Sequence, residues 1–183
     1  MTQKASTALT FKEAWSFPER VEQRIAKYVD SHRGNWLHAP VGISMLGRGL
    51  FQTKTKMTTL DINSDLKPDI VCDIFKMTEH PDIISVMKEH GGFDGVISDP
   101  LWYSKDKKKT IGLAYPDRRY LSFQVRDILK PGGKWLFNGL WNPRVKGMHI
   151  DKVEIPMQAF SSFRNVSLLV YLTRINEKID EIQ

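Results

Sequence analysis

The sequence has one cysteine, Cys72, among its 183 residues, so an internal disulfide is excluded. A lone thiol is typical of chains that work in a reducing interior, and we expect a cytoplasmic protein. The longest apolar run is about the size of Leu168–Leu172, far below the roughly 20 residues that cross a membrane. Residues 1–15 also lack the continuous apolar core of a secretory signal. We therefore expect no membrane association.

Motifs of several enzyme classes are also missing. The five histidines show no spacing typical of metal ligands, so we expect no metal. No Gly-x-Ser-x-Gly elbow is present to indicate a hydrolase. The glycines at 42, 47 and 49 do not complete a Gly-x-Gly-x-x-Gly loop, which argues against a dinucleotide dehydrogenase.

The composition is that of an ordinary globular protein, with 26% charged and 41% hydrophobic residues. The length suits one domain, and we expect an N-terminal arm over residues 1–15 followed by a single domain over 16–183. Lysine and arginine outnumber aspartate and glutamate by 27 to 21, which gives a net charge of +6. This excess permits a nucleic-acid partner without establishing one.

Strand-like and helix-like segments alternate along the chain, which predicts an α/β domain. The last two strands have no helix between them, which indicates a mostly parallel sheet with an antiparallel C-terminal strand. A first helix is expected to begin at Ser16 and to end before Gly34, and further helices over 81–89 and 117–129. Strands are expected over 36–39, 57–62, 69–72, 93–98, 134–138, 152–157 and 166–172. Over roughly residues 35–175 this order resembles the Rossmann-like fold of class I S-adenosylmethionine-dependent methyltransferases.

Acidic residues follow three successive predicted strands, at Asp61, Asp73 and Asp99. Ligands of an open parallel sheet bind beyond the carboxyl ends of its strands. A carboxylate after the second strand can accept the two hydroxyls of a ribose, and one after the third can accept an adenine amino group. Each position is also usual for a turn or helix-capping aspartate. Three in register favour a nucleoside site.

The segment Leu37–Gly42 resembles the first strand and loop of amino-methyltransferases, in which the glycine permits close approach to the cofactor. His38 stands where those enzymes usually carry an acidic residue. The resemblance implies S-adenosylmethionine as the cofactor. It also implies the residues that bind it: His38, Ala39, Pro40, Gly42, Asp61, Ile62, Asp73, Ile74 and Ser98.

The sequence Asp99-Pro100-Leu101-Trp102 directly follows the predicted fourth strand. It resembles the Asp-Pro-Pro-Trp/Tyr signature of methyltransferases that act on exocyclic amino groups such as adenine N6, with Leu101 in place of the second proline. An aryl amine is a poor nucleophile, and hydrogen bonds to Asp99 and to the Pro100 carbonyl would position its lone pair. Trp102 offers a face on which an extruded base can stack. An ordinary Asp-Pro turn after a strand is the competing interpretation.

A basic segment follows the turn, with a net charge of +4 over residues 103–119. It is either a solvated loop or a clamp on the phosphates of a polynucleotide. The functional interpretation predicts substrate contacts from Lys105, Lys107, Lys108, Lys109, Arg118 and Arg119.

Together these features predict an N-methyltransferase that modifies a nucleobase amino nitrogen, with adenine N6 in DNA favoured. Two alternatives stay open: an RNA methyltransferase acting on adenine N6 or guanine N2, and a non-catalytic nucleic-acid-binding subunit with the same fold. No separate target-recognition domain is evident, so a homo-oligomer or a partner subunit is a further expectation.

Overall fold

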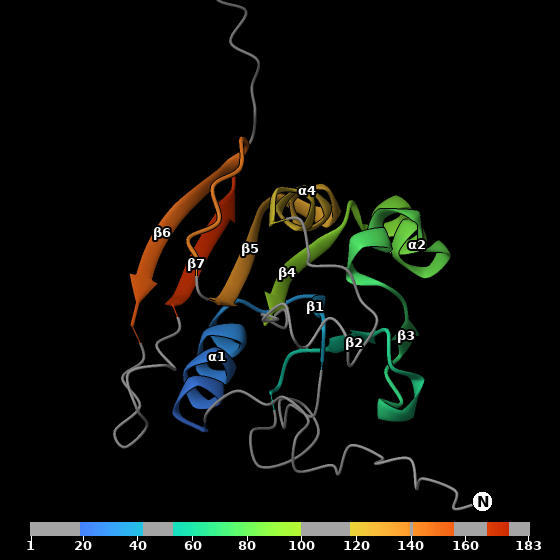
Figure 1. Ribbon diagram of the computed structural model, residues 1–183, viewed down its shortest axis with the longest axis horizontal. Coiled ribbons are helices and arrows are strands. Elements are labelled where there is room, and N and C mark those ends of the chain that lie inside the picture. Colours follow the sequence, from blue (N-terminus) through green and yellow to red (C-terminus); the bar gives the residue numbers. More distant parts are fainter. Residues whose placement is uncertain (1–18, 42–52, 100–117, 140, 156–167, 176–183) are drawn as a thin grey trace, which may run out of the picture.

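The computed structural model describes residues 19–41, 53–99, 118–139, 141–155 and 168–175. Within them, one seven-stranded sheet has the order β3-β2-β1-β4-β5-β7-β6 (Figure 1). The strands are β1 (Trp36–His38), β2 (Met57–Asp61), β3 (Ile70–Val71), β4 (Phe93–Ser98), β5 (Leu129–Gly139), β6 (Met148–Glu154) and β7 (Leu168–Arg174).

The sheet is mixed in the expected way. Strands β1 to β5 pair in parallel, and β7 pairs antiparallel with both β5 and β6. The predicted α/β class and the mostly parallel sheet with an antiparallel C-terminal strand are therefore confirmed. The last strand in sequence does not lie at the edge, because β7 is inserted between β5 and β6.

The helices lie close to their predicted positions. They are α1 (Glu19–Ser31), α2 (Pro81–His90) and α4 (Arg118–Ile128), with short 3-10 helices η2 (Ser64–Leu66) and η3 (Ile74–Glu79). The predicted strand over 152–157 is wrong by four residues at its start, since β6 begins at Met148. Residues 1–15 and the predicted cap Ser16 lie outside the described residues.

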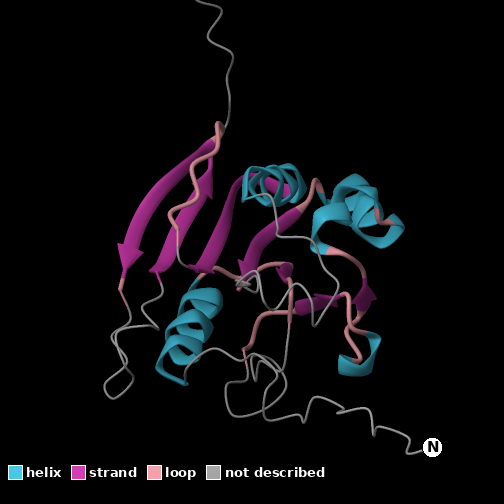
Figure 2. Cartoon of the chain, in the orientation of Figure 1, coloured by secondary structure: helices cyan, strands magenta, loops and turns pink. Residues whose placement is uncertain are grey.

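Helices cover both faces of the sheet, as Figure 2 shows. Neighbouring positions on a strand point to opposite faces, so Val96 packs in the cluster on the α2 and α4 side and Ile97 in the cluster on the α1 side. Gly95 lies against the ring of the buried Trp36, and a Cβ there would come within 2.4 Å of that ring. A glycine is needed at this position because only the bare backbone leaves room for the indole.

No helix in the described part of the chain is long and apolar enough to cross a membrane.

Candidate active site

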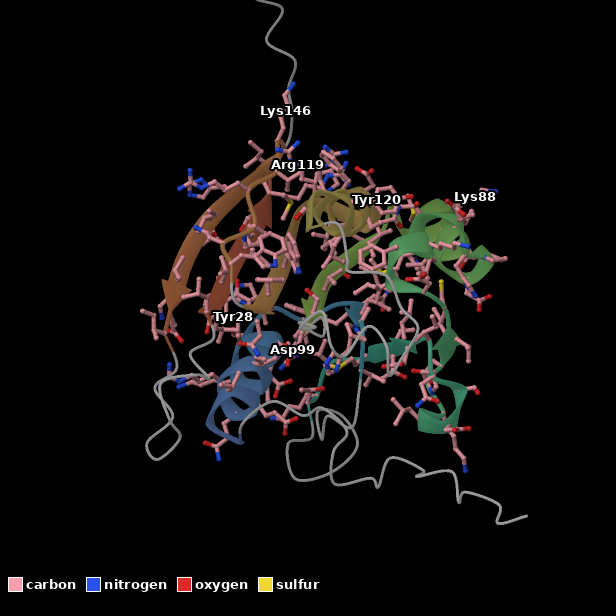
Figure 3. All side chains as sticks on the ribbon, in the orientation of Figure 1. Tyr28, Lys88, Asp99, Arg119, Tyr120 and Lys146 are labelled. Carbon is pink, nitrogen blue, oxygen red and sulfur yellow. The ribbon has the colours of Figure 1, made fainter. Side chains whose placement is uncertain are left out.

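The parallel strands bring several predicted residues to one edge of the sheet. His38, Asp61 and Asp99 are at or directly after the carboxyl ends of β1, β2 and β4, and Asp73 follows β3 by two residues. Figure 3 shows Asp99 just beyond the end of β4. The fold thus gathers at one edge residues that are far apart in sequence.

Ser98 anchors the end of β4 in the protein interior. Its side chain is fully buried, and its hydroxyl accepts a hydrogen bond of 2.7 Å from Trp135 Nε1. Trp135 is itself fully buried in β5. This bond ties β4 to β5 one residue before Asp99. Ser98, predicted to touch the cofactor, is therefore engaged with the core in this structure.

Asp99 is partly buried and lies in an unusual electrostatic environment. Burial raises the pKa of its carboxyl group to about 7, and a hydrogen bond with the Asn138 side chain acts in the opposite direction. Desolvation disfavours the charged form of an acid, whereas a donor to the carboxylate favours it. Asp99 therefore changes charge near neutral pH, which is typical of functional carboxylates.

Asn138 is a site residue that the sequence pattern indicates only as part of a strand. It lies near the end of β5, is 5% exposed, and has a buried Oδ1 without a hydrogen-bond partner among the described residues. The register that pairs Ser98 with Phe137 brings the next residues, Asp99 and Asn138, side by side. A polar residue closing the apolar run Trp-Leu-Phe is the only sequence signal for it.

Asp61 and Asp73 make local hydrogen bonds. Asp61 is 6% exposed, and its Oδ1 accepts the Asn63 amide hydrogen at 2.9 Å. Asp73 Oδ1 accepts the amide hydrogen of Phe75 at 2.9 Å and so caps η3. The turn and cap interpretation is thus correct for both, and the bond to Phe75 uses only one carboxylate oxygen of Asp73. A capping role leaves a ligand-binding role open.

The other predicted cofactor residues differ in exposure. His38 and Ala39 are fully buried, and the Ala39 side chain is part of the core. Ile62 is 48% exposed, whereas Ile74 is partly buried and packs against the core. Pro40 follows Ala39 through a cis peptide bond.

Of the residues predicted to bind substrate, the structure describes only the two arginines of α4. Arg118 begins α4, and Arg119 is exposed on it. Gly42, Pro100, Leu101, Trp102, Lys105, Lys107, Lys108 and Lys109 lie outside the described residues.

Among the residues that the structure places, no group of three or more His, Cys, Asp or Glu side chains could hold a metal ion.

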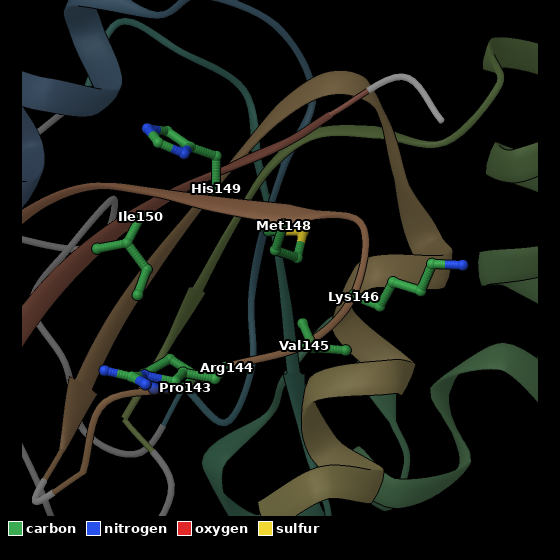
Figure 4. Close-up of a pocket in the computed structure, with 7 residues that line it drawn as sticks. All are labelled: Pro143, Arg144, Val145, Lys146, Met148, His149 and Ile150. Carbon is green, nitrogen blue, oxygen red and sulfur yellow. The ribbon is translucent and has the colours of Figure 1, made fainter. Parts of the chain in front are cut away.

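A pocket of about 490 Å³ lies away from Asp99, against the start of β6 (Figure 4). Met148 pairs with Arg174, and Thr173 pairs with Lys134, so the start of β6 is at the opposite edge of the sheet from Asp99. Arg144 and Lys146 line this pocket, but their side chains point in different directions (Figure 4). They do not converge on one ligand.

No family model and no curated protein matches the sequence. Solved structures do match its backbone. The N-methyltransferase NodS from Bradyrhizobium japonicum WM9 has a TM-score of 0.55 and 13% identity, over 86% of this chain and 96% of that one. NodS in complex with S-adenosyl-L-homocysteine gives 0.53 and 14%, over 85% and 87%. TrmN from Thermus thermophilus gives 0.52 and 12%, over 85% of this chain and 48% of that one.

The chain has a methyltransferase fold. At these identities the likeness concerns the fold alone. Within this methyltransferase fold, the roles of the site residues follow only from their own positions, contacts and chemistry.

The donor and acceptor set suits a nucleoside cofactor. Carboxylates at the ends of β2 and β3 are acceptors for hydroxyl and amino hydrogens. Asp73 Oδ2 makes no hydrogen bond to a described residue and so can serve as such an acceptor. The residues present therefore fit S-adenosylmethionine.

Proposed function

We propose that this chain transfers a methyl group from S-adenosylmethionine to an exocyclic amino nitrogen of a nucleobase, with adenine N6 in DNA favoured. One observation carries the proposal. A methyltransferase fold holds Asp99 directly after β4, with a pKa near neutrality and a buried amide beside it. In the sequence this carboxylate begins Asp99-Pro100-Leu101-Trp102, the resemblance to amino-methyltransferases.

The cofactor assignment is supported by the NodS structure that holds S-adenosyl-L-homocysteine. We assign the ribose hydroxyls to Asp61 and the adenine amino group to Asp73, because these acceptors lie at the ends of β2 and β3. When bound, S-adenosylmethionine supplies a methyl carbon on a sulfonium, whose carbon–sulfur bond breaks as the new nitrogen–carbon bond forms.

Asp99 prepares the amine for this transfer. Its carboxylate accepts one N–H of the substrate amino group, and a charged acceptor makes the stronger hydrogen bond. This interaction favours a more tetrahedral nitrogen, whose lone pair is no longer delocalised into the ring, and it fixes the direction of that lone pair. The methylated nitrogen carries one surplus proton, which is acidic and passes to water. No strong base is required.

Nucleic acid is favoured as the substrate because of the charge near the site. Residues 103–119 follow Asp99 in the sequence and carry a net charge of +4. Cationic side chains that neutralise phosphates release counterions, so they make binding dependent on salt. We expect Lys107, Lys108 and Lys109, changed together to glutamate, to lower oligonucleotide affinity and to flatten its salt dependence. A variant with unchanged salt dependence would identify the segment as a solvated loop.

The decisive experiment incubates the protein with deuterated-methyl S-adenosylmethionine and equal amounts of DNA and RNA. The nucleic acids are then separated, digested to nucleosides and analysed by mass spectrometry. We expect N6-methyladenine in the DNA, and none with Asp99→Ala. Label confined to RNA, on adenine N6 or guanine N2, would select the RNA alternative.

A matched control is Lys88→Ala, because Lys88 is exposed on α2 and forms no ion pair with a described residue (Figure 3). It should methylate like the wild type. If the wild type produces no methylated nucleoside and calorimetry detects no S-adenosylmethionine at millimolar concentration, the chain is a non-catalytic subunit instead.

A further inference from the structure

The end of β5 contains a buried amide that the fold does not require. Asn138 follows three fully buried apolar residues, Trp135, Leu136 and Phe137, and is itself 5% exposed. On the antiparallel side it pairs with the buried Leu169 of β7. An apolar residue would suit a position between such neighbours.

The amide also lacks one hydrogen bond. Asn138 Oδ1 is buried and has no partner among the residues described. A buried acceptor left unpaired destabilises the fold, because its lost hydrogen bond to water is not replaced. A side chain kept for the stability of the core alone would not carry this cost. The other half of the same amide contacts Asp99.

The chemistry of the contact fixes its direction. An ionised carboxylate only accepts hydrogen bonds, so the NH₂ group of Asn138 must be the side that faces Asp99. The pairing of Ser98 with Phe137 holds the two backbones in adjacent strands at this point. The Trp135–Ser98 bond of 2.7 Å fixes the same pair of strands one step earlier. Asn138 is therefore held by the sheet and is not free to follow Asp99.

We propose that Asn138 is the positioning residue for Asp99, whose carboxylate it orients by an amide hydrogen bond so that one oxygen stays directed at the substrate amine. This inference rests on the proposed function. Asn138 acts through Asp99, so no contact between Asn138 and substrate is required.

The same bond controls the charge of Asp99. Burial raises the pKa of Asp99, and the Asn138 amide is the influence that lowers it. Ionisable side chains described on this face of the sheet include His38 at the end of β1, Asp61 at the end of β2, Glu22 and Tyr28 in α1, and Tyr171 in β7. None of them contributes to the pKa of Asp99. Loss of the amide therefore leaves the effect of burial unopposed.

The test is a titration of the Asp99 carboxyl carbon by NMR, in full-length protein labelled with ¹³C-aspartate. Its resonance is assigned by its absence in Asp99→Asn. The variant Asn138→Leu has a similar size and no donor. We expect it to raise the pKa of Asp99 by about one pH unit, which corresponds to one hydrogen bond to a charged group. Asn138→Ser keeps a donor and should lie closer to the wild type.

The matched control is Asn142→Leu. Asn142 also has a buried Oδ1 with no partner among the described residues, and it has no effect on the pKa of Asp99. This control should leave the titration of Asp99 unchanged. Should Asn138→Leu fail to fold, Asn138→Ala removes the same donor without adding volume.

A second readout is the pH profile of methyl transfer. The acidic limb of kcat should move to higher pH in Asn138→Leu by the same amount as the Asp99 titration. A loss of kcat that is equal at every pH, with an unchanged Asp99 titration, would overturn the proposal. The NMR titration does not depend on activity, so an inactive wild type would reject the proposed function while still deciding the role of Asn138.

Discussion

The two halves of the candidate site hold their carboxylates in different ways. On the β2–β3 side, Asp61 and Asp73 accept amide hydrogens from residues two positions further along the chain. On the β4–β5 side, Asp99 is hydrogen-bonded to the side-chain amide of Asn138, which lies in another strand and 39 residues further along the sequence. Neighbouring residues in the sequence therefore position Asp61 and Asp73, whereas the pairing of β4 with β5 positions Asp99 beside Asn138.

The fold by itself explains why Asp61 and Asp73 are present, but it does not explain a buried carboxyl group at Asp99. A turn or cap aspartate stabilises its own loop whether or not a ligand binds. A carboxyl group with a pKa raised by burial is unfavourable for folding when it is ionised. Asp99 therefore gives the stronger evidence of function. Four measurements test this contrast.

The largest effect is expected from Asp99→Asn on catalysis. The amide is almost the same size, but it removes the charged acceptor for the substrate amine. Removing one preorganised hydrogen-bonding group from a reacting centre typically lowers kcat about 10²–10³-fold. Methyl transfer to oligonucleotides measures this loss. Activity within threefold of the wild type would contradict the catalytic role.

The same variant should change the pH dependence of stability. The pKa of Asp99 is about 7 in the folded protein against an ordinary value of 3.8, so between these values the native state binds more protons than the unfolded state. The stability that this group contributes is complete below pH 4 and is lost as the pH rises through 7. Relative to Asp99→Asn, the wild type should lose up to about 1.4 kcal/mol per pH unit in this window.

Urea unfolding at pH 5 and pH 8 measures the effect on stability. At pH 8 Asp99→Asn should be at least as stable as the wild type. A wild type that gains stability over Asp99→Asn between these two pH values would show that the carboxyl group is not buried as described.

A smaller effect is expected from Ser98→Ala. The change leaves the buried Nε1 of Trp135 without its acceptor, so the free energy of unfolding should fall by about 1–3 kcal/mol. Ser85→Ala is the matched control, because Ser85 makes its side-chain bond to Glu89 on the exposed surface of α2. That change should cost less than about 0.5 kcal/mol. Equal losses would mean that the β4–β5 tie is unimportant.

The smallest effect on stability is expected at Asp73. Asp73→Ala removes the cap of η3 and should cost about 1 kcal/mol, whereas Asp73→Asn keeps a capping side chain and should cost little. Both should weaken S-adenosylmethionine binding, because both remove the charged acceptor. Calorimetry measures this affinity. If Asp73→Asn binds like the wild type, Asp73 is a structural cap only.

The parts of the fold with strong local patterns were predictable. Strand β4 has the expected bounds, since a buried apolar run stands between Gly92 and Asp99. Helix α2 has Pro81 in its first turn and ends at Gly91, which are ordinary start and stop signals. Strand β6 was misplaced because none of its residues is fully buried and residues 151–153 are all exposed, which gives a weak apolar signal.

The site was only half predictable for a related reason. Asp61, Asp73 and Asp99 follow strands in the sequence, so pattern alone places them at the edge of the sheet. Asn138 lies beside Asp99 only because of the register in which β4 and β5 pair, and the sequence of either strand alone does not determine that register. The sequence also does not show that Ser98 bonds to Trp135.

The position of β7 has a consequence for how the protein is made. Strand β6 is hydrogen-bonded to β7 in the sheet, and β7 is also the strand that covers the outer side of β5. During synthesis both β5 and β6 therefore await residues 168–174, which form the last of the described strands in chain order. Until that segment leaves the ribosome, β5 presents an open, apolar edge of the kind that invites wrong pairing.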